Sequence, residues 1–593
     1  MVNSIIVGPG NMLVKILGFV SARNICYCHV CVRFSIVIIL CKLFVLGSCT
    51  NISLSIKDES QPLPVETIFK LPYPLPPWPQ GDGFGTGVID LGGLQIQQIT
   101  SFNKIWAAKY GGPDNLGATF FEPASIPDGF SMLGHYAQPN NRPLSGLVIV
   151  SKTDASDPLG EILKPPTDYT LQSTADTNVY FWTPIAPDGY KPVGLLVTTT
   201  PEKPPLDKIR CVRADFTDEL EPDVGIWSGG DNGPTAYGLR PKTRGSKAQA
   251  LSAGTFIVLK GTQDSNAAIP ISSLKNKSPT FGSMPNRDQI QALFSTYLPY
   301  FYFHPDEIYL PSSVNWFFTN GALLYTKGNE SSPIPILPPD GSNLPQGGPN
   351  DGSYWLDLPA DQQARDKIVR GDLQTAEVYL HVKNVLGATF TDVQVWVFYP
   401  FNGRATAKVG PIKRISLGQI GEHVGDWEHV TLRISNFDGA LTSVFFAQHS
   451  GGEWVESSLL EFQNGNKFAV YPSLNGHASY HRAGLTLLGN CDDVGIRDDA
   501  ARGDAWMDTG ARFVVVAAAE GEVAAPPWLE YSREWGPKVS YDIAEELKKV
   551  EKLLIGGLKS KFKKFVNSLP KEVLGEEGPT GPKMKSNWDG DEN

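Results

Sequence analysis

Residues 421–434 are Gly-Glu-His-Val-Gly-Asp-Trp-Glu-His-Val-Thr-Leu-Arg-Ile. Val430, Leu432 and Ile434 alternate with polar residues, which is the pattern of a β-strand that buries one face. The acidic and histidine residues before them are therefore expected in a loop that enters this strand. Five of the chain's nine histidines fall between positions 423 and 481, so potential metal ligands are densest in this part of the sequence.

Three side chains of this stretch predict a metal site: His423, Asp426 and Glu428. On extended backbone Asp426 and Glu428 project to the same side, and His423 can fold back over them. Carboxylates favour calcium, magnesium or manganese, whereas an imidazole leaves zinc or iron open. The residues thus predict a divalent metal ion as cofactor without giving its identity. The alternative is structural, with Trp427 buried at a sheet edge, Asp426 capping a turn and His429 bonded to backbone.

The composition indicates a folded protein built from many short strands. The 593 residues are 41% hydrophobic and 19% charged, with 59 glycines and 47 prolines, and a chain of this length is expected to form roughly two to four domains. The net charge of −11 argues against nucleic acid as a partner, because phosphate binding needs a basic face. No nucleophile elbow or phosphate loop accompanies the histidine-rich region.

Residues 1–68 are interpreted as a variable extension with a short hydrophobic segment at 34–46. Arg33 precedes this segment and Gly47 and Ser48 follow it, as in a signal peptide or a short signal anchor. Three interpretations stay open: a cleaved signal, a membrane anchor, or an extension that is not native. The expected location is cytoplasmic or peripheral endomembrane, or secretory or anchored if the segment is genuine.

An internal repeat predicts a β-prism-like domain over residues 69–270. Residues 121–130, Phe-Glu-Pro-Ala-Ser-Ile-Pro-Asp-Gly-Phe, are echoed at 181–190 by Phe-Trp-Thr-Pro-Ile-Ala-Pro-Asp-Gly-Tyr. The Pro-Asp-Gly triplets set tight turns, and a period of roughly 60 residues indicates repeated sheet units. A third unit from Ile226 through 254–258 would complete a three-fold prism, although it lacks the Pro-Asp-Gly turn. Otherwise the first two copies are unrelated hairpins with the same turn chemistry.

A β-sandwich that contains the His/Asp/Glu cluster is predicted over residues 287–540, after a linker at 271–286. Its expected strands include 377–382, 393–399, 443–448, 467–471, 485–488 and 512–517. Near its start, His304-Pro305-Asp306-Glu307 is expected to form a turn with solvated acids; the alternative is that it supplies further ligands.

Residues 541–570 predict a basic amphipathic helix, with apolar residues at three- and four-residue steps and an interruption at Gly556-Gly557. Such a helix either docks on an anionic membrane or packs on its own sandwich. The tail, 571–593, is predicted to be disordered. The fold class is therefore mainly β, a β-prism-like domain followed by a β-sandwich, with a C-terminal amphipathic helix.

From Phe69 onward the chain resembles the plant vacuolar protein sorting-associated protein 62 family. The resemblance rests on four stretches: Ile-Asp-Leu-Gly-Gly-Leu at 89–94, Gly-Gly-Pro-Asp-Asn-Leu-Gly-Ala-Thr-Phe-Phe at 111–121, Tyr-Phe-His-Pro-Asp-Glu at 302–307, and Gly-Asp-Trp-Glu-His at 425–429. The family name implies a role in delivery to the vacuole.

A second, local resemblance is to the necrosis- and ethylene-inducing-like proteins, which are β-sandwich cytolysins that engage sphingolipid headgroups through a divalent ion. Their His-x-x-Asp-x-Glu metal pattern maps onto His423, Asp426 and Glu428. Their further upstream aspartate has no counterpart, because residues 413–422 contain no aspartate. The residues that could complete the site are Glu422, His429, His449 and His477.

These features favour a non-catalytic protein of vacuolar or endomembrane sorting that recognises an anionic or glycosylated membrane lipid, or a glycan, with the help of a divalent ion. One alternative is a metal-dependent hydrolase of the same substrates, with Glu428 or His429 as the base. Another is a scaffold that binds cargo or other trafficking proteins through the prism and needs no metal.

Overall fold

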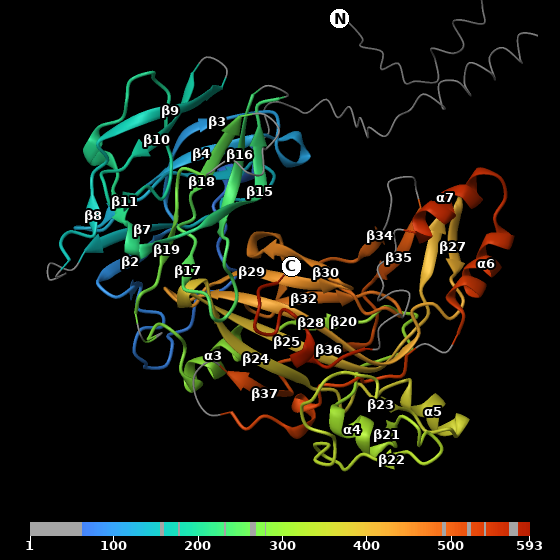
Figure 1. Cartoon of the computed structure of the whole chain (residues 1–593). Coiled ribbons are helices and arrows are strands. Elements are labelled where there is room, and N and C mark those ends of the chain that lie inside the picture. The colour runs from blue at the N-terminus through green and yellow to red at the C-terminus, as the bar shows by residue number, and fades with distance from the viewer. Residues whose placement is uncertain are drawn as a thin grey trace, which may run out of the picture. The chain divides into compact units, whose positions relative to one another are not determined.

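The computed structural model describes residues 62–592 except for 154–158, 176–177, 231–232, 261–268, 279, 281, 489–493, 519–522, 539–540 and 568–578. The predicted extension and its hydrophobic segment therefore lie outside the described residues up to position 61. Strands predominate and helices are few (Figure 1), which confirms the predicted mainly β fold. Among the described residues, no helix is both long and apolar enough to cross a membrane.

The N-terminal part contains three successive repeats of six strands. The first follows β1 (Val88–Asp90) and comprises β2 (Leu94–Ile99), β3 (Phe102–Ala107), β4 (Ala118–Pro123), β5 (Ser131–Met132), β6 (Tyr136–Pro139) and β7 (Val148–Thr153). The second comprises β8 (Leu163–Lys164), β9 (Asp168–Ala175), β10 (Val179–Ile185), β11 (Tyr190–Lys191), β12 (Leu196–Thr198) and β13 (Cys211–Arg213). The third comprises β14 (Thr217–Asp218), β15 (Leu220–Ser228), β16 (Pro234–Pro241), β17 (Ala250–Leu251), β18 (Phe256–Lys260) and β19 (Ser273–Lys275).

Equivalent strands of the three repeats pair in the same order. The sheets β3-β4-β6, β9-β10-β12 and β15-β16-β18 correspond, as do β2-β7-β5, β8-β13-β11 and β14-β19-β17. Phe120, Phe181 and Phe256, one from each repeat, pack against one another with ring centroids 5.2 to 6.4 Å apart. The segment without a Pro-Asp-Gly turn is therefore the third copy, and the β-prism-like arrangement is confirmed.

The repeats approach most closely at two glycines. A Cβ atom added to Gly134 would lie 2.8 Å from the Cα of Gly194 and 2.7 Å from the methyl group of Thr255. Any larger residue at position 134 would push the repeats apart, so the glycine is required by the close backbone approach.

Two facing sheets form the sandwich. The larger has the order β30-β29-β28-β25-β24-β37, with β24 (Val378–Val385), β25 (Phe390–Asn402), β28 (His423–Ser435), β29 (Leu441–Gln448), β30 (Gly451–Glu456) and β37 (Phe513–Ala518). The smaller has the order β31-β32-β20-β36, with β20 (Tyr300–Tyr302), β31 (Phe462–Gln463), β32 (Lys467–Pro472) and β36 (Trp506–Asp508); β33 (Ser479–Tyr480) pairs with β32. Val395 and Val430 of the larger sheet meet Phe468 of the smaller in one apolar core, which α3 (Arg287–Tyr297) helps to close.

The outer face of the larger sheet is buried too. It is covered by α4 (Val314–Thr319), β21 (Leu323–Thr326), β22 (Ile334–Pro335), β23 (Tyr354–Asp357) and α5 (Gln362–Ile368). Trp427 on β28 packs there against Trp528 and Trp535, with ring centroids 5.3 and 5.2 Å away. Because both faces are covered, polar side chains along β28 lie in a protein interior and need specific partners.

A small lobe carries the C-terminal helices. The sheet β27-β26-β35-β34 consists of β26 (Thr406–Val409), β27 (Ile412–Ser416), β34 (Gly484–Leu488) and β35 (Val494–Ala500). α6 (Ile543–Leu553) and α7 (Gly557–Val566) are separated at the predicted Gly556-Gly557 break. Their apolar residues, including Val550 and Phe562, pack against Val409 and Ile496. The apolar stripe of the predicted helix thus packs on its own domain.

The predicted disorder of the tail is wrong for residues 579–592. Trp588 is buried, and the ammonium group of Lys383 donates to the carbonyl oxygens of Asn587 at 2.6 Å and Gly590 at 2.9 Å. Ser246 of the prism donates its backbone N–H to the carbonyl of Asp589. The polar composition predicts disorder, but tertiary partners hold this segment between prism and sandwich.

Candidate functional site

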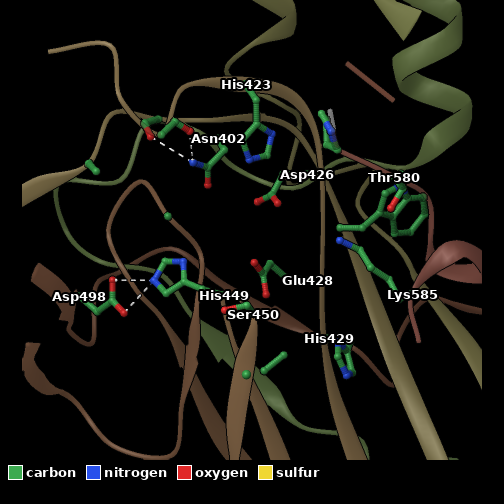
Figure 2. Close-up of a pocket in the computed structure, with 18 of the residues that line it drawn as sticks. Asn402, His423, Asp426, Glu428, His429, His449, Ser450, Asp498, Thr580 and Lys585 are labelled. Atoms are coloured by element: carbon green, nitrogen blue, oxygen red, sulfur yellow. Dashed lines mark hydrogen bonds and ion pairs between the residues drawn. The ribbon is translucent and has the colours of Figure 1, made fainter. Parts of the chain in front are cut away.

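A cavity of about 420 Å³ lies where β28 begins, next to the end of β25 and the C-terminal tail. Its walls include Asn402, Asp426, Glu428, His449 and Lys585, which point into the same space (Figure 2). They come from three separate parts of the chain and from a tail predicted to be disordered. The cavity is within the size range of small-molecule sites, roughly 300 to 1,000 Å³.

The three predicted metal ligands all line this cavity. His423 pairs with Asn402 across the β25–β28 ladder, Asp426 with Tyr399, and Glu428 with Val397. The predicted loop around them is wrong, because β28 already begins at His423. Asp426 and Glu428 share one side of the strand, as the alternation predicts.

His477 orients Asp426. The His477 Nδ1 lies 2.8 Å from an Asp426 carboxylate oxygen, and its Nε2 lies 3.1 Å from the carbonyl oxygen of Tyr309. The imidazole stacks on the Tyr399 ring at 3.9 Å, with an angle of 7° between the planes. These contacts hold Asp426 in one orientation, which is what an outer partner does for a ligand-binding carboxylate.

Glu307 completes the support behind His477. Its carboxylate is 2% exposed, lies 3.8 Å from the His477 Nε2 and accepts a hydrogen bond of 2.6 Å from the backbone N–H of Asn475. The expectation of solvated acids in the 304–307 turn is therefore wrong for this residue.

The carboxyl groups of Asp426 and Glu428 differ in their pKa values. Burial opposes the ionisation of Asp426, but the hydrogen bond to His477 and the nearby His423 outweigh it, so its pKa lies below the usual value. Burial, reinforced by the Asp426 carboxylate, raises the pKa of Glu428 well above its usual value. Glu428 therefore favours its protonated, uncharged form, and the Lys585 ammonium group offsets only part of this shift.

His423 faces the same cavity without a complete set of partners. Burial lowers the pKa of His423, which favours the neutral imidazole. Its Nδ1 is buried and has no hydrogen-bond partner among the described residues. This nitrogen is therefore available to a group that enters the cavity. As the described side chains stand, however, no three His, Cys, Asp or Glu residues converge closely enough to hold a metal ion.

Two further histidines of the region, His449 and His429, have other partners. His449 Nε2 lies 3.1 Å from Asp498, which accepts a hydrogen bond of 2.5 Å from the Tyr480 hydroxyl. His429 Nε2 lies 3.2 Å from Glu592 of the tail and stacks on Trp396. The structural alternative is confirmed for Trp427, which is buried. It is wrong for the other two residues, because Asp426 contacts His477 rather than capping a turn, and His429 contacts the Glu592 side chain rather than backbone.

The residues missed in the sequence are those distant along the chain. Asp498, Lys585 and Glu592 carry no local motif that links them to β28, and only the folded topology brings them to its cavity. His477 is among the residues that could complete the site, and Glu307 lies in the 304–307 stretch for which further ligands are the alternative.

The family model for vacuolar protein sorting-associated protein 62 matches residues 65–592. The chain belongs to this family. Its name associates its members with vacuolar protein sorting, and the resemblance seen from residue 69 onward is confirmed. No curated protein gives a significant match to the chain.

Several solved structures have a local likeness to this family member. GNIP1Aa from Chromobacterium piscinae is 16% identical, with a TM-score of 0.26, over 35% of this chain and 40% of that one. NLPPya in complex with glucosamine is 12% identical, with a TM-score of 0.17, over 36% and 69%. Necrosis and Ethylene inducing Protein 2, from the causal agent of cocoa's Witches Broom disease, is 14% identical, with a TM-score of 0.15, over 37% and 79%. This chain therefore spans less than half the length of GNIP1Aa.

Proposed function

We propose that this protein is a non-catalytic recognition protein of vacuolar and endomembrane sorting, and that its β28 cavity binds the sugar or other polyhydroxylated headgroup of a membrane lipid or glycan together with a divalent cation. The observation that carries this proposal is the pair of carboxyl groups, Asp426 and Glu428, facing one cavity beside the unsatisfied nitrogen of His423. A peripheral location on endomembranes fits this role.

The chemistry of the walls suits a hydroxylated ligand. Asp426 and Asn402 supply acceptor oxygens, and Lys585 supplies an ammonium group. Trp396 and Phe445 add apolar ring surface to the same cavity. Small-molecule sites typically combine such aromatic walls with a few placed polar groups, which fix the orientation of the ligand.

A divalent cation would compensate the negative charge of the carboxyl groups in the site. The Glu428 carboxyl is costly to ionise where it stands, and a cation nearby would favour its charged form. Asp426, Glu428 and the neutral imidazole of His423 are the residues that would hold the ion, with His477 orienting Asp426 from behind. Two oxygens and one nitrogen leave calcium, magnesium, manganese and zinc as candidates.

Calorimetric titration of the full chain with calcium, magnesium and zinc tests the cation. We expect saturable binding of one ion that is lost in Asp426→Asn and in Glu428→Gln. Glu453→Gln on β30 is the matched control, because Glu453 is an exposed acid that does not line the cavity. Failure of every ion to bind the wild-type chain would overturn the metal part of the proposal.

The headgroup is tested next, in the presence of the ion that binds. Free monosaccharides and glycosylated-lipid vesicles are titrated against wild type, Asp426→Asn and Glu453→Gln. Binding by wild type and the control alone supports the proposal, whereas equal binding by all three contradicts it. Release of free sugar in the same samples would instead favour the hydrolase, in which Glu428 acts as the base on metal-activated water.

A further inference from the structure

The turn between α6 and α7 presents two apolar side chains to solvent. Leu553 is 67% exposed and Ile555 is 83% exposed, whereas their neighbour Leu554 is 4% exposed. Gly556 follows in a left-handed conformation, φ 58°, and nothing lies within 4 Å of a Cβ added there. A single exposed apolar side chain needs no explanation. Two of them at the tip of one helical hairpin, however, form an exposed apolar surface.

Packing does not account for these two residues. The apolar stripe of both helices is satisfied by Val550, Leu554, Phe562 and Phe565, which are buried against the lobe sheet. Figure 1 shows α6 and α7 side by side on β27 and β35, with their connecting turn at the end of the lobe. Leu553 and Ile555 lie outside this cluster.

The same hairpin is basic although the protein as a whole is acidic. Residues 543–567 contain seven lysines against three glutamates, hence a local net charge of +4, whereas the whole chain carries −11. All seven lysines are exposed. Two of the glutamates already have lysine partners, Glu546 with Lys549 and Glu551 with Lys559 and Lys563. The surface around the apolar tip is therefore positive on both helices.

We propose that the α6–α7 tip docks on the surface of an anionic lipid membrane, with Leu553 and Ile555 entering the headgroup region and the flanking lysines contacting acidic headgroups. An apolar anchor and a basic surface each bind membranes weakly, and together they give stable attachment. The charge complementarity favours a membrane of acidic lipids over a neutral one. This surface shares no residue with the β28 cavity and is independent of the function proposed for it.

Vesicle flotation of the full chain tests the docking surface. The vesicles contain either phosphatidylcholine alone or phosphatidylcholine with about one third phosphatidylserine. We expect the wild type to bind the acidic vesicles at least about tenfold more than the neutral ones, and to be released by high salt. The double variant Leu553→Ser/Ile555→Ser is expected to lose at least about tenfold of this binding.

Val224→Ser is the matched control, because Val224 is 71% exposed in the prism and its replacement should leave vesicle binding unchanged. Thermal unfolding of all variants establishes that each one is folded. No binding of wild type to acidic vesicles, or equal binding by the tip variant, would overturn the proposal. Loss of binding in Val224→Ser would overturn it too, because the tip would then not be the contact. The vesicles contain no glycosylated lipid, which separates this test from that of the cavity.

Discussion

Glu428 stands where folding alone would favour an uncharged side chain. Burial and the adjacent Asp426 carboxylate both oppose its ionisation, and these two effects raise its pKa. A glutamine of the same shape would avoid this cost. Sites kept for binding commonly lower the stability of the free protein in this way, because groups arranged for a ligand are unsatisfied without it.

We therefore predict that Glu428→Gln stabilises the ligand-free protein by about 1 kcal/mol near neutral pH. The folded-state pKa lies above the ordinary value of 4.5, so the folded protein binds more protons than the unfolded chain in the window above 4.5. The wild type consequently loses stability as pH rises through that window, whereas the variant does not. Urea unfolding at pH 4 and pH 8 measures the difference, which should be near zero at the lower pH. Glu453→Gln should show no such gain, and a destabilised Glu428→Gln at pH 8 would contradict the prediction.

At the scale of residues, local alternation was enough to place Asp426 and Glu428 on one side of a strand, because side chains in a strand alternate strictly. It could not place Asp498 or Lys585 beside them. Their proximity depends on how β28, β35 and the tail are arranged in space, and no local sequence pattern predicts that arrangement.

At the scale of elements, the tail is held by charge as well as by packing. Glu592 lies 3.2 Å from His429 and accepts hydrogen bonds from Gln394 and Thr431, and Asp591 lies 3.0 Å from Arg433. Burial opposes the ionisation of Glu592, but His429 and Lys383 outweigh it and lower its pKa. Because the tail forms one wall of the cavity, its docking controls the shape of the site.

We predict that docking of the tail weakens in acid. The pKa of Glu592 is lower in the folded protein than its ordinary value of 4.5, so its contribution is complete above pH 4.5 and is lost as pH falls below it. Hydrogen exchange of backbone amides in residues 580–592, compared with those of β25, should show earlier loss of protection in the tail. Glu592→Gln should show that loss already at pH 7, while Glu453→Gln, an exposed acid of β30, should not. Equal protection of the tail at pH 3.5 and pH 7 would contradict this prediction.

The hydrophobic period of α6 and α7 is visible in the sequence because amphipathic helices repeat every three to four residues. The sequence does not show which surface this apolar face covers, because the same stripe fits a membrane or a sheet. The lobe sheet covers the stripe, and only the tip residues Leu553 and Ile555 remain exposed.

At the scale of the whole molecule, prism and sandwich belong to one compact unit from Leu63 to Asn593. Gln98 of β2 donates a hydrogen bond of 2.6 Å to Asp438 beyond β28, and the Asn276 amide donates one of 2.7 Å to the Gly387 carbonyl. Asn276 falls in the predicted linker, yet it is 1% exposed. Composition shows where the repeats end, but it does not show whether a connecting segment is packed. The predicted domain limits therefore remain predictions.

The start of the folded unit is the last point to test. Val65, in the short turn Pro64–Glu66, is 4% exposed and packs against Phe121 and Leu144 of the prism. The backbone N–H of Leu144 donates to the Thr67 carbonyl at 2.8 Å, and Phe69 donates back to the Leu144 carbonyl. The expected boundary at residue 69 therefore cuts through a packed segment.

We predict that a chain beginning at Leu63 folds with the stability of the full chain, and that one beginning at Phe69 folds with about 1.5–3 kcal/mol less, because it loses the burial of Val65. Denaturant unfolding followed by tryptophan fluorescence measures both chains. Val65→Ala in the longer chain separates the packing of the Val65 side chain from the backbone hydrogen bond to Thr67. It removes the packing but keeps the Thr67 carbonyl, so it should lower the free energy of unfolding by less than the truncation to Phe69 does. Identical midpoints for the chains beginning at Leu63 and Phe69 would show that residues 63–68 contribute nothing to the fold, and the boundary at residue 69 would then stand.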